Sequence, residues 1–282
     1  MILQMVKRNL RSYFRDTSNV FFSMLGVIII IGLYMTFLGN MITGVVSDLA
    51  GDQARFLMDS WIMGGVVAAS TVTTTLGAFG IMVDDREKKT VRDFLSSPMK
   101  RSSLVLSYIL SAMVIGLFMS LFTFVLAEIY IVLHGSILPF VSILKVLGII
   151  ILNVAASSAM AFFLLSFIKS SNAMTALSIV VGTIIGFLTG IYIPMGNLNE
   201  GLQTIIKFFP PSHAAVLLRQ VMMDHAMSLD TLPSEVLRFL GVQFEIGGNV
   251  VSGWIHLLFL VATFLIFYAM SILLVSKRKE KE

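Results

Sequence analysis

The chain has 282 residues, of which 57% are hydrophobic and 13% charged, and its mean hydropathy is +0.92. Soluble domains carry about a quarter charged residues, so this composition excludes a soluble globular protein and predicts an integral membrane protein. The net charge of +4 does not indicate nucleic-acid binding, because the basic residues lie at the edges of apolar stretches rather than in an aromatic-rich basic stripe. The chain has no cysteine, so it has neither a disulfide framework nor a thiolate metal site.

Residues 2–16 are predicted to form an amphipathic helix at the membrane interface. With a repeat of about 3.6 residues, apolar side chains fall on one side of this helix and basic side chains on the other. Both a generic basic anchor and a helix with a specific mechanical role fit this pattern. The apolar set is Ile2, Leu3, Val6, Leu10, Tyr13 and Phe14, and the basic set is Lys7, Arg8, Arg11 and Arg15.

Six apolar stretches are each long enough to cross a bilayer, which takes roughly 20 residues. They cover residues 20–38, 61–83, 104–133, 146–168, 173–193 and 253–275. An even number of spans places both termini on the same side of the membrane. Fifteen of the 20 Lys and Arg residues lie on that side, so the positive-inside rule predicts cytoplasmic termini. The predicted fold is a single all-α membrane domain.

A dense charge cluster at residues 84–101 separates the second and third spans, and residues 84–98 are predicted to form a helix. Asp84 or Asp85 fits its N-cap, and Pro98 fits its end. An apolar stripe ringed by charges of both signs suits a groove on a partner protein, although an interfacial helix resting on lipid is the alternative. The acidic residues favour the partner, because an anionic leaflet repels them. The residues predicted to dock are Arg86, Glu87, Lys88, Val91, Arg92, Phe94, Leu95 and Pro98.

Two clusters inside the spans are candidates for function. Hydroxyl groups in the second span could line a substrate pathway, or they could bond back to carbonyl groups one turn earlier in their own helix. Glycines at every fourth position of the fifth span form a face that lets another helix approach closely, in the same chain or in a second copy. These residues are Thr71, Thr74 and Thr75 in the second span, and Gly182, Gly186 and Gly190 in the fifth.

Residues 194–252 lie between the last two spans and are predicted to contain a re-entrant pair of short helices. Prolines punctuate two weakly apolar segments, 198–209 and 214–223, each too short to cross the membrane. Ser212 fits the N-cap of the second segment. An ordinary outer loop with two surface helices is the alternative, and residues 224–252 are expected to form an outward loop.

Several catalytic patterns are missing from the sequence. No P-loop, HExxH or Gly-x-Ser-x-Gly motif occurs, and no paired acidic or histidine residues lie inside the spans. Any ATP must therefore be hydrolysed on another chain, and an intramembrane enzyme or scaffold is disfavoured. An ion-coupled carrier is disfavoured as well, because the sequence lacks an inverted repeat with broken spans.

Short motifs occur in a fixed order along nearly the whole chain. They are Arg15-Asp16, Arg86-Glu87 with Thr90, Leu95-Ser96-Ser97-Pro98 with Arg101, Ile193-Pro194, Phe208-Phe209-Pro210 and Leu218-Arg219. Together with the order of helices, this pattern resembles the permease subunit of an ABC-2 type ABC transporter. The chain has Leu198-Asn199 where family members usually have a second proline, and Pro210-Pro211 where they have Asn-Pro.

The resemblance implies a bacterial or archaeal cell membrane protein with an elbow helix at residues 2–16. Residues 84–98 would be the coupling helix that docks on a separate ABC ATPase subunit, and residues 197–223 the re-entrant pair. Two ATPase copies would bind ATP and magnesium beside a second permease copy, with a homodimer preferred over a heterodimer. The chain itself is expected to contact membrane lipid, to bind no cofactor, metal or nucleic acid, and to catalyse no reaction.

The substrate can be predicted only as a chemical class. The spans are rich in Phe, Met, Ile and Thr and nearly free of charge, which favours export of an amphiphilic molecule such as a drug, an antimicrobial peptide or a lipid-like compound. A lipid-linked glycan exporter of the same family is the alternative, and an ion-coupled secondary transporter is less favoured.

Overall fold

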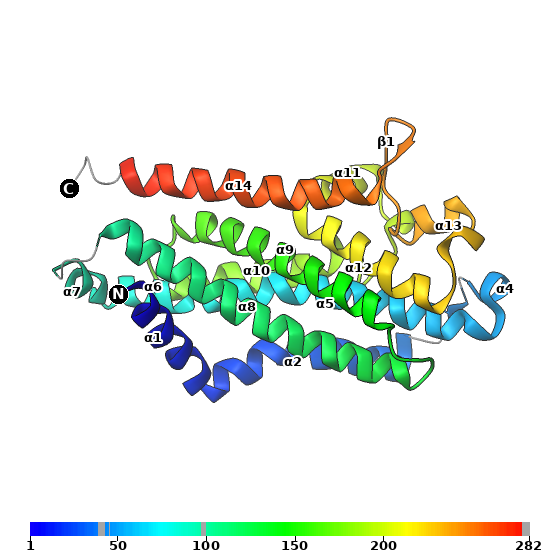
Figure 1. The fold of residues 1–282 in the computed structure, drawn as a ribbon, viewed down its shortest axis with the longest axis horizontal. Helices are drawn as coiled ribbons and strands as arrows, with labels where there is room; N and C mark the ends of the chain where they lie inside the picture. The colour runs from blue at the N-terminus through cyan, green and yellow to red at the C-terminus, as the bar shows by residue number, and fades with distance from the viewer. Residues whose placement is uncertain (39–42, 45, 97–99, 278–282) are drawn as a thin grey trace.

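A computed structural model describes residues 1–38, 43–44, 46–96 and 100–277 as an elongated bundle of helices (Figure 1). The long helices are α2 (Thr17–Leu33), α5 (Ala54–Ala78), α8 (Arg101–Val132), α9 (Phe140–Leu165), α10 (Ser171–Leu188) and α14 (Gly253–Lys277). The shorter ones are α1 (Ile2–Arg15), α4 (Ser47–Ala50), α6 (Gly80–Glu87), α7 (Thr90–Ser96), α11 (Glu200–Phe208), α12 (Pro210–Ala226) and α13 (Ser234–Phe239).

The remaining described elements are single turns and one small hairpin. A π-helical turn, Tyr34–Leu38, continues α2, and 3-10 turns cover Gly51–Gln53, Met195–Asn197 and Leu229–Thr231. Strands β1 (Glu245–Ile246) and β2 (Asn249–Val250) pair antiparallel, with Glu245 opposite Val250.

The bundle has two different ends (Figure 1). The N-terminus, α1, α6, α7 and the last turn of α14 lie at one end, which we call the α7 end. Helices α4 and α13 and the hairpin lie at the other, the α13 end. This layout follows from the chain order, because each long helix carries the chain from one end to the other.

Within the described residues, five helical stretches are long and apolar enough to cross a membrane, and a sixth is formed if the bent pair α1 and α2 counts as one. The five are Ser47–Glu87, Ser102–Val132, Phe140–Leu165, Ser171–Leu188 and Gly253–Leu274. The chain is thus an all-α, multi-pass membrane protein. The bent pair turns by 61° between its two helices, so α1 does not continue the direction of α2.

Several span boundaries differ from the prediction by a few residues, and the structure gives a reason for two of them. The second span begins at Ala54 rather than at Trp61, because Arg55 and Asp59 pair at 3.0 Å across one helical turn and so fit inside the helix. The fifth span ends at Leu188 rather than at residue 193. Gly190 has a φ of 67°, in the left-handed region that glycine adopts readily, and this turn stops the helix.

The connection between the last two spans contains more regular structure than the sequence suggested. Helix α12 begins at Pro210, and Ser212 is not its N-cap. The Ser212 hydroxyl instead donates a hydrogen bond to the Leu188 carbonyl oxygen at 2.6 Å. Helix α12 packs against α5, α9 and α14, and most of its side chains are buried. The segment predicted as an outward loop contains α13 and the hairpin.

Candidate functional site

The charged segment after the second span forms two helices instead of one. Helix α6 continues α5 beyond Phe79 and ends at Glu87, and α7 begins only at Thr90. The helix is broken at Lys89, whose φ of 60° lies in the left-handed region. The predicted start at Asp84 or Asp85 is therefore wrong, because both residues lie within α6, where no N-cap is needed.

Two of the predicted docking residues bind within the chain. The Arg86 guanidinium donates from Nη1 to the Leu165 carbonyl oxygen at 3.0 Å and lies 3.4 Å from that of Ile168, at the end of α9. Glu87 accepts a hydrogen bond from the Ser171 backbone N–H at 2.9 Å and contacts the Ser171 hydroxyl. Both side chains therefore connect α6 to neighbouring segments of the same chain.

The contact of α6 with the start of α10 is made by three side chains. The Ser171 hydroxyl lies 2.7 Å from Asp84 Oδ1 and also contacts Glu87. We call Asp84, Glu87 and Ser171 the α6–α10 contact. Because carboxylates at a helix N-terminus are favoured by the helix dipole, this contact stabilises the first turn of α10.

A second junction connects α1 with α6, α7 and α8. Arg8 of α1 forms an ion pair with Asp85 of α6, and its guanidinium lies 4.8 Å from the centre of the Phe94 ring of α7. Tyr108 of α8 donates a hydrogen bond to the same carboxylate at 2.6 Å. The sequence missed this arrangement, because only the fold brings these distant residues together.

The apolar side chains that are predicted to dock are partly covered by other residues of the same chain. Val91 and Phe94 are half-buried and pack against the core at the α7 end, whereas Lys88, Lys89 and Asp93 are exposed. The side chains of Arg92 and Leu95, and the whole of Pro98, lie outside the described residues. The described surface of this region therefore combines the exposed charges of Lys88, Lys89 and Asp93 with the half-buried side chains of Val91 and Phe94.

The predicted pathway hydroxyls have the alternative arrangement. Thr71, Thr74 and Thr75 are buried, and they donate hydrogen bonds to carbonyl oxygens three or four residues earlier, at 2.7, 2.6 and 2.7 Å. The expectation that they line a pathway is therefore not supported within the single chain, because each hydroxyl is bonded to its own helix.

The three glycines of the fifth span do not share one function. The Tyr192 ring covers Gly186, and Gly190 forms the turn after α10 and packs on Arg219. Of these three glycines, Gly182 is the one where an added Cβ would meet no atom within 4 Å. Any contact of this face with a second chain would therefore centre on Gly182.

Arg219 of α12 is a second site that sequence reasoning named only as part of a motif. Its side chain is buried, and it donates to the Trp61 carbonyl oxygen at 3.1 Å and to that of Gly190 at 2.9 Å. The guanidinium also lies 4.5 Å from the centre of the Trp61 ring. No ion pair to Arg219 occurs among the described residues.

An apolar cavity lies between the fifth span and its neighbours. It has a volume of about 140 Å³ and is lined by α5, α9 and α10, with Phe209 at one end. The lining is almost wholly apolar, with Ser157 as its one polar residue. This cavity lies beside the helix that the α6–α10 contact holds.

The comparison with protein families agrees with this architecture. The family model of the ABC-2 type transporter matches residues 2–223, from α1 to most of α12. The chain belongs to the ABC-2 type transporter family. No curated protein matched the chain.

Membership in this family settles the general activity. The ABC-2 membrane domain is the permease component of an ABC-type transporter and does not itself hydrolyse ATP. Permeases of this family generally work with an ABC ATPase partner.

Proposed function

We propose that this ABC-2 permease is the membrane-spanning subunit of an exporter, and that a separate ABC ATPase docks on α7 in the cytoplasm. The α6–α10 contact is the observation that carries the proposal. A two-residue turn joins α7 to α6, so a movement of α7 would also move α6. Helix α6 in turn binds the first turn of α10 through Ser171. Displacement of α7 would therefore move α10, which borders the apolar cavity.

The docking surface would combine the half-buried apolar side chains of α7 with the exposed charges of the turn that precedes it. Val91 and Phe94 would fill a groove on the ATPase, and Lys88 would pair at its rim, with its side chain 73% exposed. Arg8 behind the Phe94 ring would position that ring. The excess of basic residues at the α7 end supports placing that end, with both termini, in the cytoplasm.

The complete transporter would contain two permease copies and two ATPase copies, which bind ATP and magnesium. A single bundle with a cavity of about 140 Å³ is too small to enclose a route for a large amphiphile. In the most apolar part of α10 and of α14, only 17% is buried, the smallest share among the five spanning stretches. Both helices therefore have apolar faces free for lipid or a second copy. A homodimer is the simpler assembly.

The outer segment would act as a re-entrant pair. Helices α11 and α12 are each shorter than a full span, and α12 is surrounded by three long helices rather than by solvent. A helix can end at membrane depth where protein surrounds it, because other parts of the chain then satisfy its free backbone groups. The packing of α12 among three long helices therefore supports the proposal. Residues of α12 would then close the route on the outer side.

The substrate would be an amphiphile moved outward, such as a drug, an antimicrobial peptide or a lipid-like molecule. The cavity supports this class, because its lining offers apolar contact and only one hydroxyl. Deleting the chain should raise cellular accumulation of amphiphilic dyes. Unchanged accumulation together with loss of a surface polymer would instead favour a lipid-linked glycan.

The docking step can be tested with Phe94→Ala. Removal of a buried interface anchor typically costs about 2 kcal/mol, so we expect about a thirtyfold weaker complex with the ATPase. Co-purification of the ATPase and stimulated ATP hydrolysis should fall together, while membrane insertion persists. The matched control is Phe122→Ala, at an exposed phenylalanine of α8 inside the span, which should leave both readouts unchanged.

A helix that rests on lipid gives a different result. In that case the ATPase would co-purify with Phe94→Ala as well as with the wild type. The double change Lys88→Ala and Lys89→Ala would then be the more damaging variant, through lost attraction to headgroups. That pattern would refute docking on α7.

A further inference from the structure

Helix α1 has a face that is already used by the bundle. Met5, Asn9 and Tyr13 are buried, and two of them form hydrogen bonds to long helices. Asn9 donates to the Ser111 hydroxyl of α8 at 3.0 Å, and Tyr13 donates to that of Ser23 in α2 at 3.1 Å. These contacts fix the rotation of α1 about its own axis, so the direction of its other faces is determined.

A second face of α1 is apolar and exposed. Leu3 is 79% exposed and Phe14 37% exposed. The Phe14 ring meets that of Phe118 edge-on, with 5.4 Å between the ring centres, and Phe118 is itself exposed on the spanning helix α8. This face continues the lipid-facing side of α8, and it therefore marks where the hydrocarbon layer meets α1.

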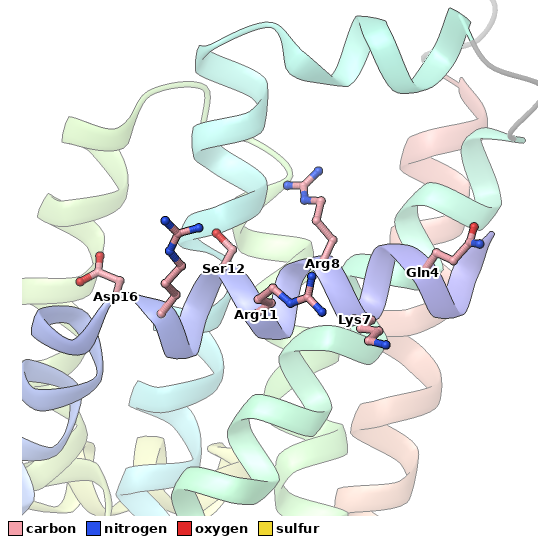
Figure 2. Close-up of a pocket in the computed structure, with 7 residues that line it drawn as sticks. Gln4, Lys7, Arg8, Arg11, Ser12 and Asp16 are labelled. Atoms are coloured by element: carbon pink, nitrogen blue, oxygen red, sulfur yellow. The ribbon is translucent and has the colours of Figure 1, made fainter.

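The third face carries basic side chains one helical turn apart. Lys7, Arg11 and Arg15 are exposed, and with Gln4 and Ser12 they line an open groove of about 730 Å³ (Figure 2). None of the ion pairs among the described residues involves these three side chains. Asp16 is the one carboxylate that lines the groove, and it lies at the far end from Gln4 (Figure 2).

Arg8 belongs to the same groove but differs in its partners. Its guanidinium is paired with Asp85, and Figure 2 shows its side chain leaving α1 in a different direction from that of Lys7. Arg8 therefore forms an ion pair within the fold, whereas none of the described ion pairs involves Lys7, Arg11 or Arg15. Three exposed cations on one row repel one another weakly, so an anion bound along the row would be stabilised by all three.

We propose that Lys7, Arg11 and Arg15 bind the phosphate of an anionic phospholipid in the leaflet that faces the α7 end. The adjoining apolar face places the acyl region beside Leu3 and Phe14, which leaves the phosphate level with the basic row. Gln4 and Ser12 supply neutral donors for the remaining headgroup oxygens. A lipid fits better than an acidic protein, because the basic row and the exposed apolar face lie side by side on one short helix.

The test measures retained lipid on the purified full-length permease. The protein is extracted from vesicles of phosphatidylcholine and phosphatidylglycerol in equal parts, washed in detergent, and its bound lipid is quantified by mass spectrometry. We expect the wild type to retain phosphatidylglycerol in excess over phosphatidylcholine. The triple variant Lys7→Gln, Arg11→Gln, Arg15→Gln should lose this excess by at least about tenfold, given the attraction of each basic side chain to an anionic surface.

The matched control removes the same charge at the same end of the bundle. Lys88, Lys89 and Lys169 are exposed and lie off α1, so their triple change to Gln should leave retention unchanged. Equal loss in this control would overturn the site in favour of net charge. Displacement of the lipid by inorganic phosphate alone would overturn the lipid as the source.

The readout also separates this proposal from ATPase docking. Lipid retention needs no ATPase, so a failure of docking on α7 leaves this test intact. If the α1 triple variant keeps its phosphatidylglycerol but loses co-purified ATPase, the row serves a protein partner and the lipid proposal is wrong.

Discussion

The charge contacts that differ most in burial lie at opposite ends of the bundle. At the α7 end, charged groups are partly open to solvent: the Arg8 side chain is 34% exposed and that of Lys88 73% exposed. At the α13 end, Arg219 and Asp59 are buried, at 3% and 0% exposure. Exposed pairs contribute little and can be rearranged, whereas a buried charge that loses its partners is costly. The α7 end is therefore suited to being moved by a partner, and the α13 end to holding its arrangement.

Helix α10 connects these two ends. Its first turn is held by the α6–α10 contact, and the turn that follows it ends at Gly190, whose carbonyl accepts from Arg219. Between these points α10 borders the apolar cavity and has few buried side chains. A movement that begins at α7 would reach the α13 end along this helix.

The largest effect that tests this comparison of the two ends is expected at the buried Arg219. The change Arg219→Ala leaves the carbonyl groups of Trp61 and Gly190 without a donor and opens a cavity beside the Trp61 ring. We expect a loss of about 3 kcal/mol in unfolding free energy, in the range for buried groups. Thermal unfolding of the purified protein in detergent measures it. Arg219→Lys should recover only part, because an ammonium group cannot reach two carbonyl groups and stack on the ring.

Arg238→Ala is the matched control at the same end. Its side chain is 40% exposed and pairs with Glu245, and such surface pairs contribute at most about 1 kcal/mol. If Arg238→Ala lowered the unfolding temperature as much as Arg219→Ala, burial would not separate the strong contacts from the weak ones. The comparison of the two ends would then fail.

The sequence predicted the long helices well, because each one depends on the local hydropathy of its own residues. All six predicted spans overlap helices of the structure, and Ile2–Arg15 form a helix as predicted. What the sequence did not predict depends on contacts between distant residues. Val6 and Tyr13 belong to the buried face of α1 while Leu3 and Phe14 are exposed, and packing against the neighbouring helices separates these two sets.

The candidate site was predicted less completely for the same reason. Arg86 and Glu87 were assigned to a partner, since their charge pattern suggests exposure, but their bonding partners are Leu165 and Ser171. Those partners lie about 80 residues further along the chain, and no local pattern signals them. The buried charge of Arg219 was equally hidden, because its acceptors are carbonyl groups, which every residue has.

A smaller effect is expected at the α6–α10 contact. Ser171→Ala removes the hydroxyl that Asp84 and Glu87 share but keeps the backbone N–H. Transport should fall by about threefold to thirtyfold, the range for residues that couple two sites, while the ATPase still co-purifies. The control is Thr175→Ala, one turn further on, whose hydroxyl bonds only to the Ser171 carbonyl oxygen. Unchanged transport in Ser171→Ala would show that α10 is not moved through this contact.

The smallest effect, and the finest test of α10, is expected at Gly182. An added methyl group there meets no atom of this chain within 4 Å, so Gly182→Ala should leave the folded monomer intact or slightly favour its helix. A second copy packed on this face would be pushed away, and we expect about threefold less crosslinked dimer in membranes. Gly148→Ala in α9 is the control, because that glycine is equally open. Equal dimer yields in both variants would place the interface elsewhere. The contacts of α10 would then be those within its own chain, at its first turn and at Gly190.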